Sequence, residues 1–195
     1  MNNIHEIIEQ IKILEKRLST EIQKKQQEFY YIIQDKKIYF QETTRQYHRS
    51  LTTSIPAYIT QASLLNILTG PLVWACLIPA ALLDLFVSIF QAFSFPIYGI
   101  PKVRRSDYIV VDRHALQYLN PIEKINCIYC GYFNGLIGYI QEIGARTEQY
   151  WCPIKHARKV RTIHNRYKNF LEYGDAETYK KKLEETRADF RDIEE

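Results

Sequence analysis

A long apolar block, residues 51–101, most constrains how this chain can fold. Its most apolar part, Leu72–Phe90, reads LVWACLIPAALLDLFVSIF, and only Asp84 and Ser88 in it are polar. As a helix rising about 1.5 Å per residue, this stretch nearly spans a hydrocarbon core of about 30 Å. A chain of 195 residues has too few other apolar faces to cover such a helix on every side, so we expect the block to be embedded in a membrane.

The charges that flank the block indicate its orientation. More basic residues follow the block than precede it, which places the C-terminal part in the cytoplasm by the positive-inside rule. The chain opens with polar residues in a helical pattern and not with a secretory signal, so we expect the soluble parts on the cytoplasmic side of an inner membrane. A single span would export the charged N-terminal region, which favours a segment that enters and leaves on the same side. The basic residues are Arg45 and Arg49 before the block and Lys102, Arg104, Arg105 and Arg113 after it.

Two prolines divide the block. Pro71 and Pro79 each remove a backbone donor, so we expect two helical arms, Ser63–Ala75 and Pro79–Phe95, in a hairpin or re-entrant segment. The first arm would be only about 20 Å long, which suits shallow insertion better than a full span. The one acid, Asp84, would then be either a functional carboxylate inside the membrane or an interfacial group.

The charged remainder predicts a mainly α-helical chain. Apolar residues recur at three- and four-residue spacings from Ile4, which predicts one long amphipathic helix to about Arg49. Such a helix can dock on its own domain, pair with a second copy or bind a partner protein as a coiled coil. A second amphipathic helix is expected over Ala176–Ile193. We therefore expect an N-terminal helix, a membrane segment, a cytoplasmic domain and a C-terminal helix, over residues 1–50, 51–101, 102–172 and 173–195.

One short run after the block predicts a strand. Tyr108–Val111 is rich in β-branched residues and is bounded by turn-forming residues. The next residues, Asp112-Arg113-His114, combine an acid, a base and a histidine, but consecutive side chains point in different directions on any regular element. We interpret them as a local turn or helix start, with His114 a weak catalytic candidate.

Three cysteines and a histidine have the spacing of metal ligands. Two residues separate Cys127 from Cys130, which is the spacing of a chelating turn. Three residues separate Cys152 from His156, which places both on one side of the first turn of a helix that begins at Pro153. The pattern C-x2-C-x21-C-x3-H predicts a closed tetrahedral zinc site in the domain at residues 102–172, with an iron–sulfur cluster as the alternative cofactor. A redox pair at C-x2-C and merely buried thiols are further interpretations.

Charged residues near the predicted metal site suggest two other roles. A basic run between Glu148 and Glu172 favours contact with anionic lipid headgroups. Nucleic acid is an unlikely partner, since the formal charge is only +4 and no nucleic-acid module is recognisable. The predicted lipid contacts are Lys155, Arg158, Lys159 and Arg161, and the weak catalytic candidates are Glu142, Arg146, Glu148 and His114.

Three stretches of the chain carry a resemblance: FPIYGIPKVRRSDYIVVDRHALQYLN, IEKINCIYCGYFNG and ARTEQYWCPIKHAR. They resemble an uncharacterised family of small bacterial membrane-associated proteins with an NCxYC…YWCPIKHA signature. The resemblance implies a bacterial source and no particular activity. The patterns above predict a membrane-anchored, zinc-binding scaffold or adaptor at the cytoplasmic face. The alternative is a membrane-bound enzyme that acts on a lipid or lipid-linked substrate near the metal.

Overall fold

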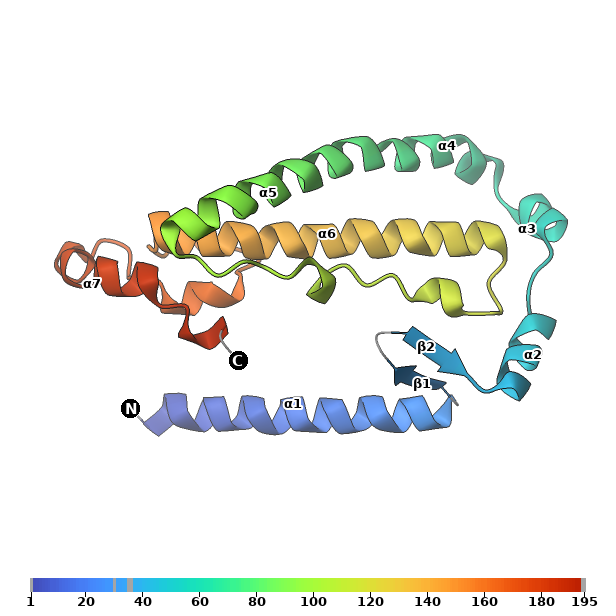
Figure 1. The fold of residues 1–195 in the computed structure, drawn as a ribbon, viewed down its shortest axis with the longest axis horizontal. Helices are drawn as coiled ribbons and strands as arrows, with labels where there is room; N and C mark the ends of the chain where they lie inside the picture. The colour runs from blue at the N-terminus through green and yellow to red at the C-terminus, as the bar shows by residue number, and fades with distance from the viewer. Residues whose placement is uncertain (1, 30, 35–36, 194–195) are drawn as a thin grey trace. The chain divides into compact units, whose positions relative to one another are not determined.

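The computed structural model describes residues 2–29, 31–34 and 37–193. Most of these residues lie in helices, which confirms the prediction of a mainly α-helical chain (Figure 1). The chain divides into two compact units. Unit 1 comprises Met1–Gln61 and Asp112–Ile128, and unit 2 comprises Ala62–Val111 and Tyr129–Glu195.

The first segment of unit 1 contains a long helix, a two-stranded antiparallel ribbon and two short helices. The prediction of one helix from Ile4 to about Arg49 is therefore wrong. The residues of the ribbon are mainly β-branched and aromatic, and such residues pack well in cross-strand pairs, as Tyr31 does opposite Phe40. The elements are α1 (Asn2–Glu28), β1 (Tyr31–Gln34), β2 (Lys37–Phe40), α2 (Glu42–Ser50) and α3 (Ile55–Gln61).

The second segment of unit 1 joins the first and leads into the longest helix. Thr52 Oγ1 donates a hydrogen bond to the carbonyl oxygen of Gln117 at 2.7 Å, which ties the two segments together. A single 3-10 turn, η2 (Arg113–Ala115), follows Asp112. The structure therefore agrees with the interpretation of Asp112-Arg113-His114 as a local turn.

Helix α6 (Pro121–Trp151) begins in unit 1 and contributes its larger part to unit 2. A capping box fixes its start, because Asn120 Oδ1 accepts from the backbone N–H of Glu123 at 3.0 Å and a Glu123 oxygen accepts from that of Asn120 at 2.8 Å. Pro121 occupies the first helical position, where proline is favoured. The helix continues unbroken through Cys127 and Cys130, so the predicted chelating turn is not formed.

The apolar block forms helices α4 (Leu64–Ala75) and α5 (Leu77–Tyr98) of unit 2. The two follow one another as a single bowed rod (Figure 1). Cys76 between them keeps near-helical angles, φ −62° and ψ −17°, so the chain does not reverse there and the predicted hairpin is not formed. Pro79 lies in the first turn of α5, where a helix tolerates proline.

Gly99, with φ 66°, caps α5 and turns the chain back along it. Ile100–Val111 then runs beside α5 and α6 in mostly irregular backbone, so the strand predicted at Tyr108–Val111 is wrong. The run lies against the backbone of α6 and not beside another strand. This close approach requires Gly135, since a Cβ there would lie 2.6 Å from the carbonyl oxygen of Tyr108.

The C-terminal part of unit 2 packs on the end of α6. Helix α7 (Ala176–Ala188) lies within the stretch where an amphipathic helix was predicted. Gln149 of α6 is fully buried and donates to the carbonyl oxygens of Thr186 at 2.9 Å and Asp189 at 2.6 Å. It also accepts from the buried guanidinium of Arg166. Single 3-10 turns in unit 2 are η1 (Arg105–Asp107), η3 (Asn165–Asn169) and η4 (Arg191–Ile193).

Unit 2 has a small core between α5, α6 and the segments that pack on them. Its buried apolar side chains come from all of these parts, so the core fixes how α5 lies against α6. The members that are at most 5% exposed are Phe95, Ile100, Val103, Leu136, Tyr139, Ile143 and Phe190.

Candidate membrane-contacting surface

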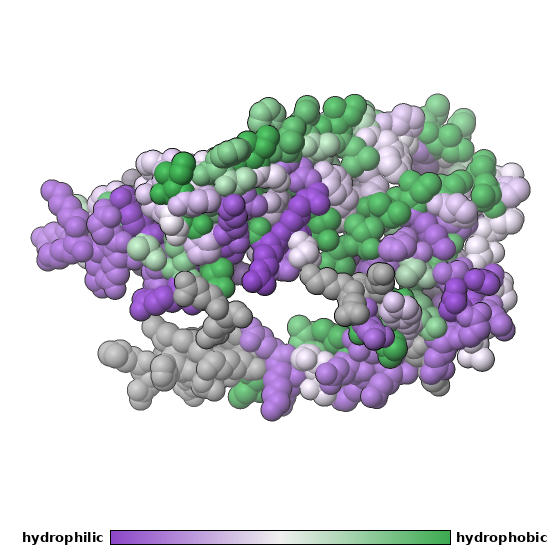
Figure 2. All heavy atoms as spheres, in the orientation of Figure 1, coloured by the Kyte–Doolittle hydropathy of each residue, from purple (hydrophilic) through white to green (hydrophobic). Residues whose placement is uncertain are grey.

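The outward side of α4 and α5 is apolar along its length and exposed. The stretch Leu64–Tyr98 is long and apolar enough to cross a membrane, and only 6% of its most apolar window is buried within the protein. Figure 2 shows a hydrophobic band over these two helices. Soluble monomers rarely expose so long an apolar patch, so this surface is suited to a lipid or protein contact. We call it the outer face; it includes Leu64, Leu68, Leu72, Ile78, Phe86, Phe93 and Ile97, each at least 66% exposed.

The opposite side of α5 carries three of its polar side chains, Asp84, Ser88 and Gln91, which are spaced to share one side of a helix. Asp84 accepts hydrogen bonds from Arg105, from Ser88 Oγ at 3.3 Å and from the Tyr132 hydroxyl at 2.9 Å. Its side chain is 13% exposed, so the carboxylate is turned toward the protein and away from the outer face. Burial, and then the bond to Asp84, raises the pKa of Tyr132 above its usual value.

Gln91 joins α5 to two other parts of unit 2. Its Oε1 accepts from the backbone N–H of Val103 at 3.0 Å, and its Nε2 donates to the carbonyl oxygen of Val103 at 3.4 Å. The same amide nitrogen donates to the Tyr139 hydroxyl on α6. Because Gln91 is 8% exposed, these bonds replace water contacts that burial removes. Together with Asp84, Gln91 fixes which side of α5 faces out.

Aromatic residues cluster at both ends of α5. Where α4 meets the start of α5, Trp74 of α4 packs on Tyr129 of α6 with ring centroids 5.1 Å apart. At the end, Tyr98 stacks on Tyr150 at 4.9 Å and meets Trp151 at 5.3 Å. Tyrosine and tryptophan have an apolar ring with a polar tip and are enriched at membrane–water interfaces. The clusters therefore suit the two ends of a helix that touches a membrane.

The predicted metal ligands are not brought together. Continuous helix of about 33 Å, at about 1.5 Å per residue, separates Cys130 from Cys152 within unit 2. Cys152 and His156 do not begin a helix, because Ile154 instead forms an isolated bridge with Leu171. Within the described ranges, no three His, Cys, Asp or Glu residues are grouped to hold a metal ion. In this structure the residues do not fit zinc or an iron–sulfur cluster, and zinc stays a prediction for metal analysis to test.

The predicted catalytic candidates are engaged in structural contacts or lie apart. Arg146 pairs with Glu142 at 2.8 Å and donates to the carbonyl oxygen of Pro101 at 2.7 Å, so this is a buried ion pair of the fold. Glu148 contacts His164 Nε2 at 3.0 Å. His114 is exposed on a 3-10 turn of unit 1, whereas the other candidates belong to unit 2. These contacts give no arrangement of a nucleophile with a base.

The predicted lipid-contacting cations lie in the irregular segment after α6. Arg158, Lys159 and Arg161 are exposed there. Lys155 is half-buried and pairs with Glu172 at 2.5 Å. Three of the four residues are thus free to meet an anionic surface, and their role in lipid contact stays a prediction.

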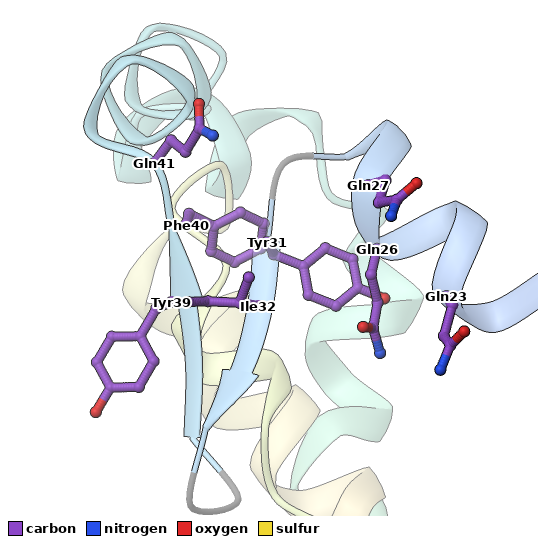
Figure 3. Close-up of a pocket in the computed structure, with 8 residues that line it drawn as sticks. All are labelled: Gln23, Gln26, Gln27, Tyr31, Ile32, Tyr39, Phe40 and Gln41. Atoms are coloured by element: carbon purple, nitrogen blue, oxygen red, sulfur yellow. The ribbon is translucent and has the colours of Figure 1, made fainter.

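Unit 1 contains an open hollow of about 660 Å³ between the end of α1 and the β1–β2 ribbon (Figure 3). Glutamine amides and aromatic rings line it, and its lining includes no acid, histidine or cysteine. It therefore offers contacts to a neutral group and no side chain that is charged near neutral pH. The lining residues are Gln23, Gln26, Gln27, Tyr31, Ile32, Tyr39, Phe40 and Gln41.

Comparison of the chain with protein-family models, with curated proteins and with solved structures finds no match. The resemblance to bacterial membrane-associated proteins therefore stays an expectation from the sequence. Function is accordingly inferred from the geometry of unit 2.

Sequence reasoning missed the residues that orient the outer face. Tyr132 has no sequence pattern that separates a buried hydrogen-bonding role from an exposed one. The spacing of Asp84, Ser88 and Gln91 was a usable signal, because three polar residues on one side of an apolar helix indicate a side turned away from lipid.

Proposed function

We propose that this protein is a membrane-anchored scaffold or adaptor that attaches to one leaflet through the outer face. The observation that carries the proposal is the division of α5 into an exposed apolar side and a polar side bonded to its own unit. For a helix with this division, the free energy of membrane binding is most favourable when its apolar side enters the acyl region and the rest of the protein stays in water.

Shallow attachment suits the surroundings of α5 better than a crossing. Arg105 reaches Asp84 near the middle of α5, and Lys102 and Arg104 are exposed on the same segment. A perpendicular crossing would carry this segment into hydrocarbon with α5, at a cost of about 2.5–3.5 kcal/mol for each unpaired cation. With α5 in the plane of the leaflet, the cations stay at headgroup level.

The scaffold part of the proposal is supported by α1. Its described apolar side chains Leu14, Leu18 and Ile22 are 61%, 62% and 48% exposed, at four-residue spacing along one side. Such a stripe fits a partner helix or a second copy of the chain. We place both units on the cytoplasmic side of a bacterial inner membrane, which accessible tags at each end of the chain would test.

Flotation of the full-length protein with lipid vesicles tests the attachment. The variant Phe86→Glu/Phe93→Glu puts two charges on the outer face, and Leu14→Glu/Leu18→Glu makes the same change on exposed positions of α1 as the matched control. We expect the wild type and the control to float with vesicles and the first variant to stay in solution with an unchanged melting temperature. Failure of the wild type to float, or equal loss in the control, would refute attachment through the outer face.

A further inference from the structure

We infer that Lys102 and Arg104 form a binding border for anionic lipid headgroups beside α5. The inference rests on the proposed function and names the class of lipid that this attachment selects. It starts from the segment that returns along α5 after Gly99, in which Val103 is buried between two exposed cations.

The backbone of this segment directs the two cations away from the protein interior. Val103 is 4% exposed and bonds Gln91 through its N–H at 3.0 Å. Arg104 has extended angles, φ −82° and ψ 111°, and successive side chains of extended backbone point to opposite sides. Lys102 and Arg104 therefore project on the side opposite to Val103 and share one exposed surface.

The segment is held in place on both sides of Lys102. Arg146 donates to the carbonyl oxygen of Pro101 at 2.7 Å, and Gln91 bonds both backbone groups of Val103. A ligand that binds the two cations therefore does not have to order the backbone that carries them, which lowers the entropy cost of binding.

The charges of Lys102 and Arg104 are uncompensated in the described part of the chain, where neither side chain has an ion-pair or hydrogen-bonding partner. Their neighbour Arg105 differs, because it pairs with the carboxylate of Asp84. That bond neutralises the one acid of the apolar helices and raises the pKa of Arg105. Two unpaired cations thus remain next to α5, with no acid of that helix free to repel a phosphate.

The position of these cations fits lipid headgroups. Gln91, which bonds Val103, is on the inward side of the helix whose outward side carries Phe93 and Phe86, so the cations lie about one helix diameter, about 10 Å, from the apolar surface. That is headgroup level when the outer face enters the acyl region. Long basic side chains can lay their stems along apolar surface and keep their charge at the headgroups. At about 1 kcal/mol for each cation near an anionic surface, the pair should raise affinity for anionic vesicles by roughly 30-fold.

Sedimentation of the full-length protein with two kinds of vesicle tests the inference. One kind is pure phosphatidylcholine, and the other contains about 30% phosphatidylglycerol, which supplies the anionic surface. The variant Lys102→Gln/Arg104→Gln is compared with Lys180→Gln/Lys182→Gln, which removes two exposed cations of α7 at the same spacing, and with Arg158→Gln/Lys159→Gln/Arg161→Gln.

We expect the wild type to bind both vesicles and to prefer the anionic ones, with a preference that declines as salt rises. In Lys102→Gln/Arg104→Gln, most of this preference should be lost while binding to phosphatidylcholine is kept, and the α7 control should keep both. A wild type without preference, or a preference lost only in the Arg158, Lys159 and Arg161 variant, would overturn the inference and leave the proposed function intact. Absence of binding to either vesicle would instead refute the proposed function.

Discussion

The two sides of α5 have different contacts, although the hydropathy averaged along the helix does not distinguish them. The inward side has Asp84 and Gln91 bonded to the returning segment and to α6, and Phe95 fully buried. The outward side has Phe86 and Phe93 about two-thirds exposed or more. The inward contacts therefore hold the fold together and leave the outward side free for a membrane. Changes on the two sides should affect different properties.

Gln91→Ala should reduce stability more than any other single change proposed for α5 or α6. It leaves the buried N–H of Val103 and the hydroxyl of Tyr139 without this partner, at about 1–3 kcal/mol for each group. We expect the free energy of unfolding to fall by about 3 kcal/mol in chemical denaturation of the purified protein. Vesicle binding by the molecules that remain folded should be unchanged. A stable Gln91→Ala variant that no longer binds vesicles would reverse the roles of the two sides.

Gly135→Ala should have the next largest effect, because the new methyl group would lie 2.6 Å from the carbonyl oxygen of Tyr108 and 2.7 Å from the Cα of Ile109. We expect a loss of about 2 kcal/mol, as for other overpacked sites. Gly144→Ala on the same helix is the matched control, since a methyl group added there would have nothing within 4 Å. That change should be neutral or stabilising by up to about 1 kcal/mol. Equal melting temperatures for the two variants would contradict the close approach at Gly135.

Cys152→Ser and His156→Ala should have the smallest effects. Both residues are exposed and are not grouped with Cys127 and Cys130, so each melting temperature should stay close to that of the wild type. Thermal unfolding together with zinc analysis of the purified protein checks this. Unfolding of both variants with loss of bound zinc would restore the zinc site predicted from the sequence, since binding energy at such a site is largely folding energy.

Strong periodicity predicted part of the fold. The tail helix near Ala176 follows from apolar residues at helical spacing, and helix over Leu72–Phe90 follows from the length of its apolar run. The prediction of a chelating turn used a short pattern with two physical solutions. Cys127 and Cys130 are three residues apart, which suits one side of a helix as well as a turn, and the capping box at Asn120 was the signal for the helix.

The remaining errors concern contacts between distant segments. Tyr108–Val111 has strand-forming residues, but a strand needs a partner, and the neighbour of this run is the glycine-lined backbone of α6. The bonding of Gln91 likewise depends on where residue 103 lies after the turn at Gly99. Local sequence predicts neither contact. The contact of Tyr108–Val111 with α6 joins residues that are distant in the sequence, and the contact of Gln91 with Val103 depends on the chain reversal at Gly99.

Depth measurement along the outer face tests the central claim most directly. Nitroxide labels are placed singly at Ile78→Cys, Phe86→Cys and Phe93→Cys in a chain whose four native cysteines are serine, and their depth in vesicles is read by relaxation with oxygen and with a water-soluble agent. In-plane attachment predicts that all three labels lie at one shallow depth in a single leaflet, about 5–10 Å into the headgroup and acyl boundary. A maximum of depth at Phe86 with shallow labels at Ile78 and Phe93 would instead show that α5 crosses the membrane, and three labels in water would show that the outer face binds no membrane.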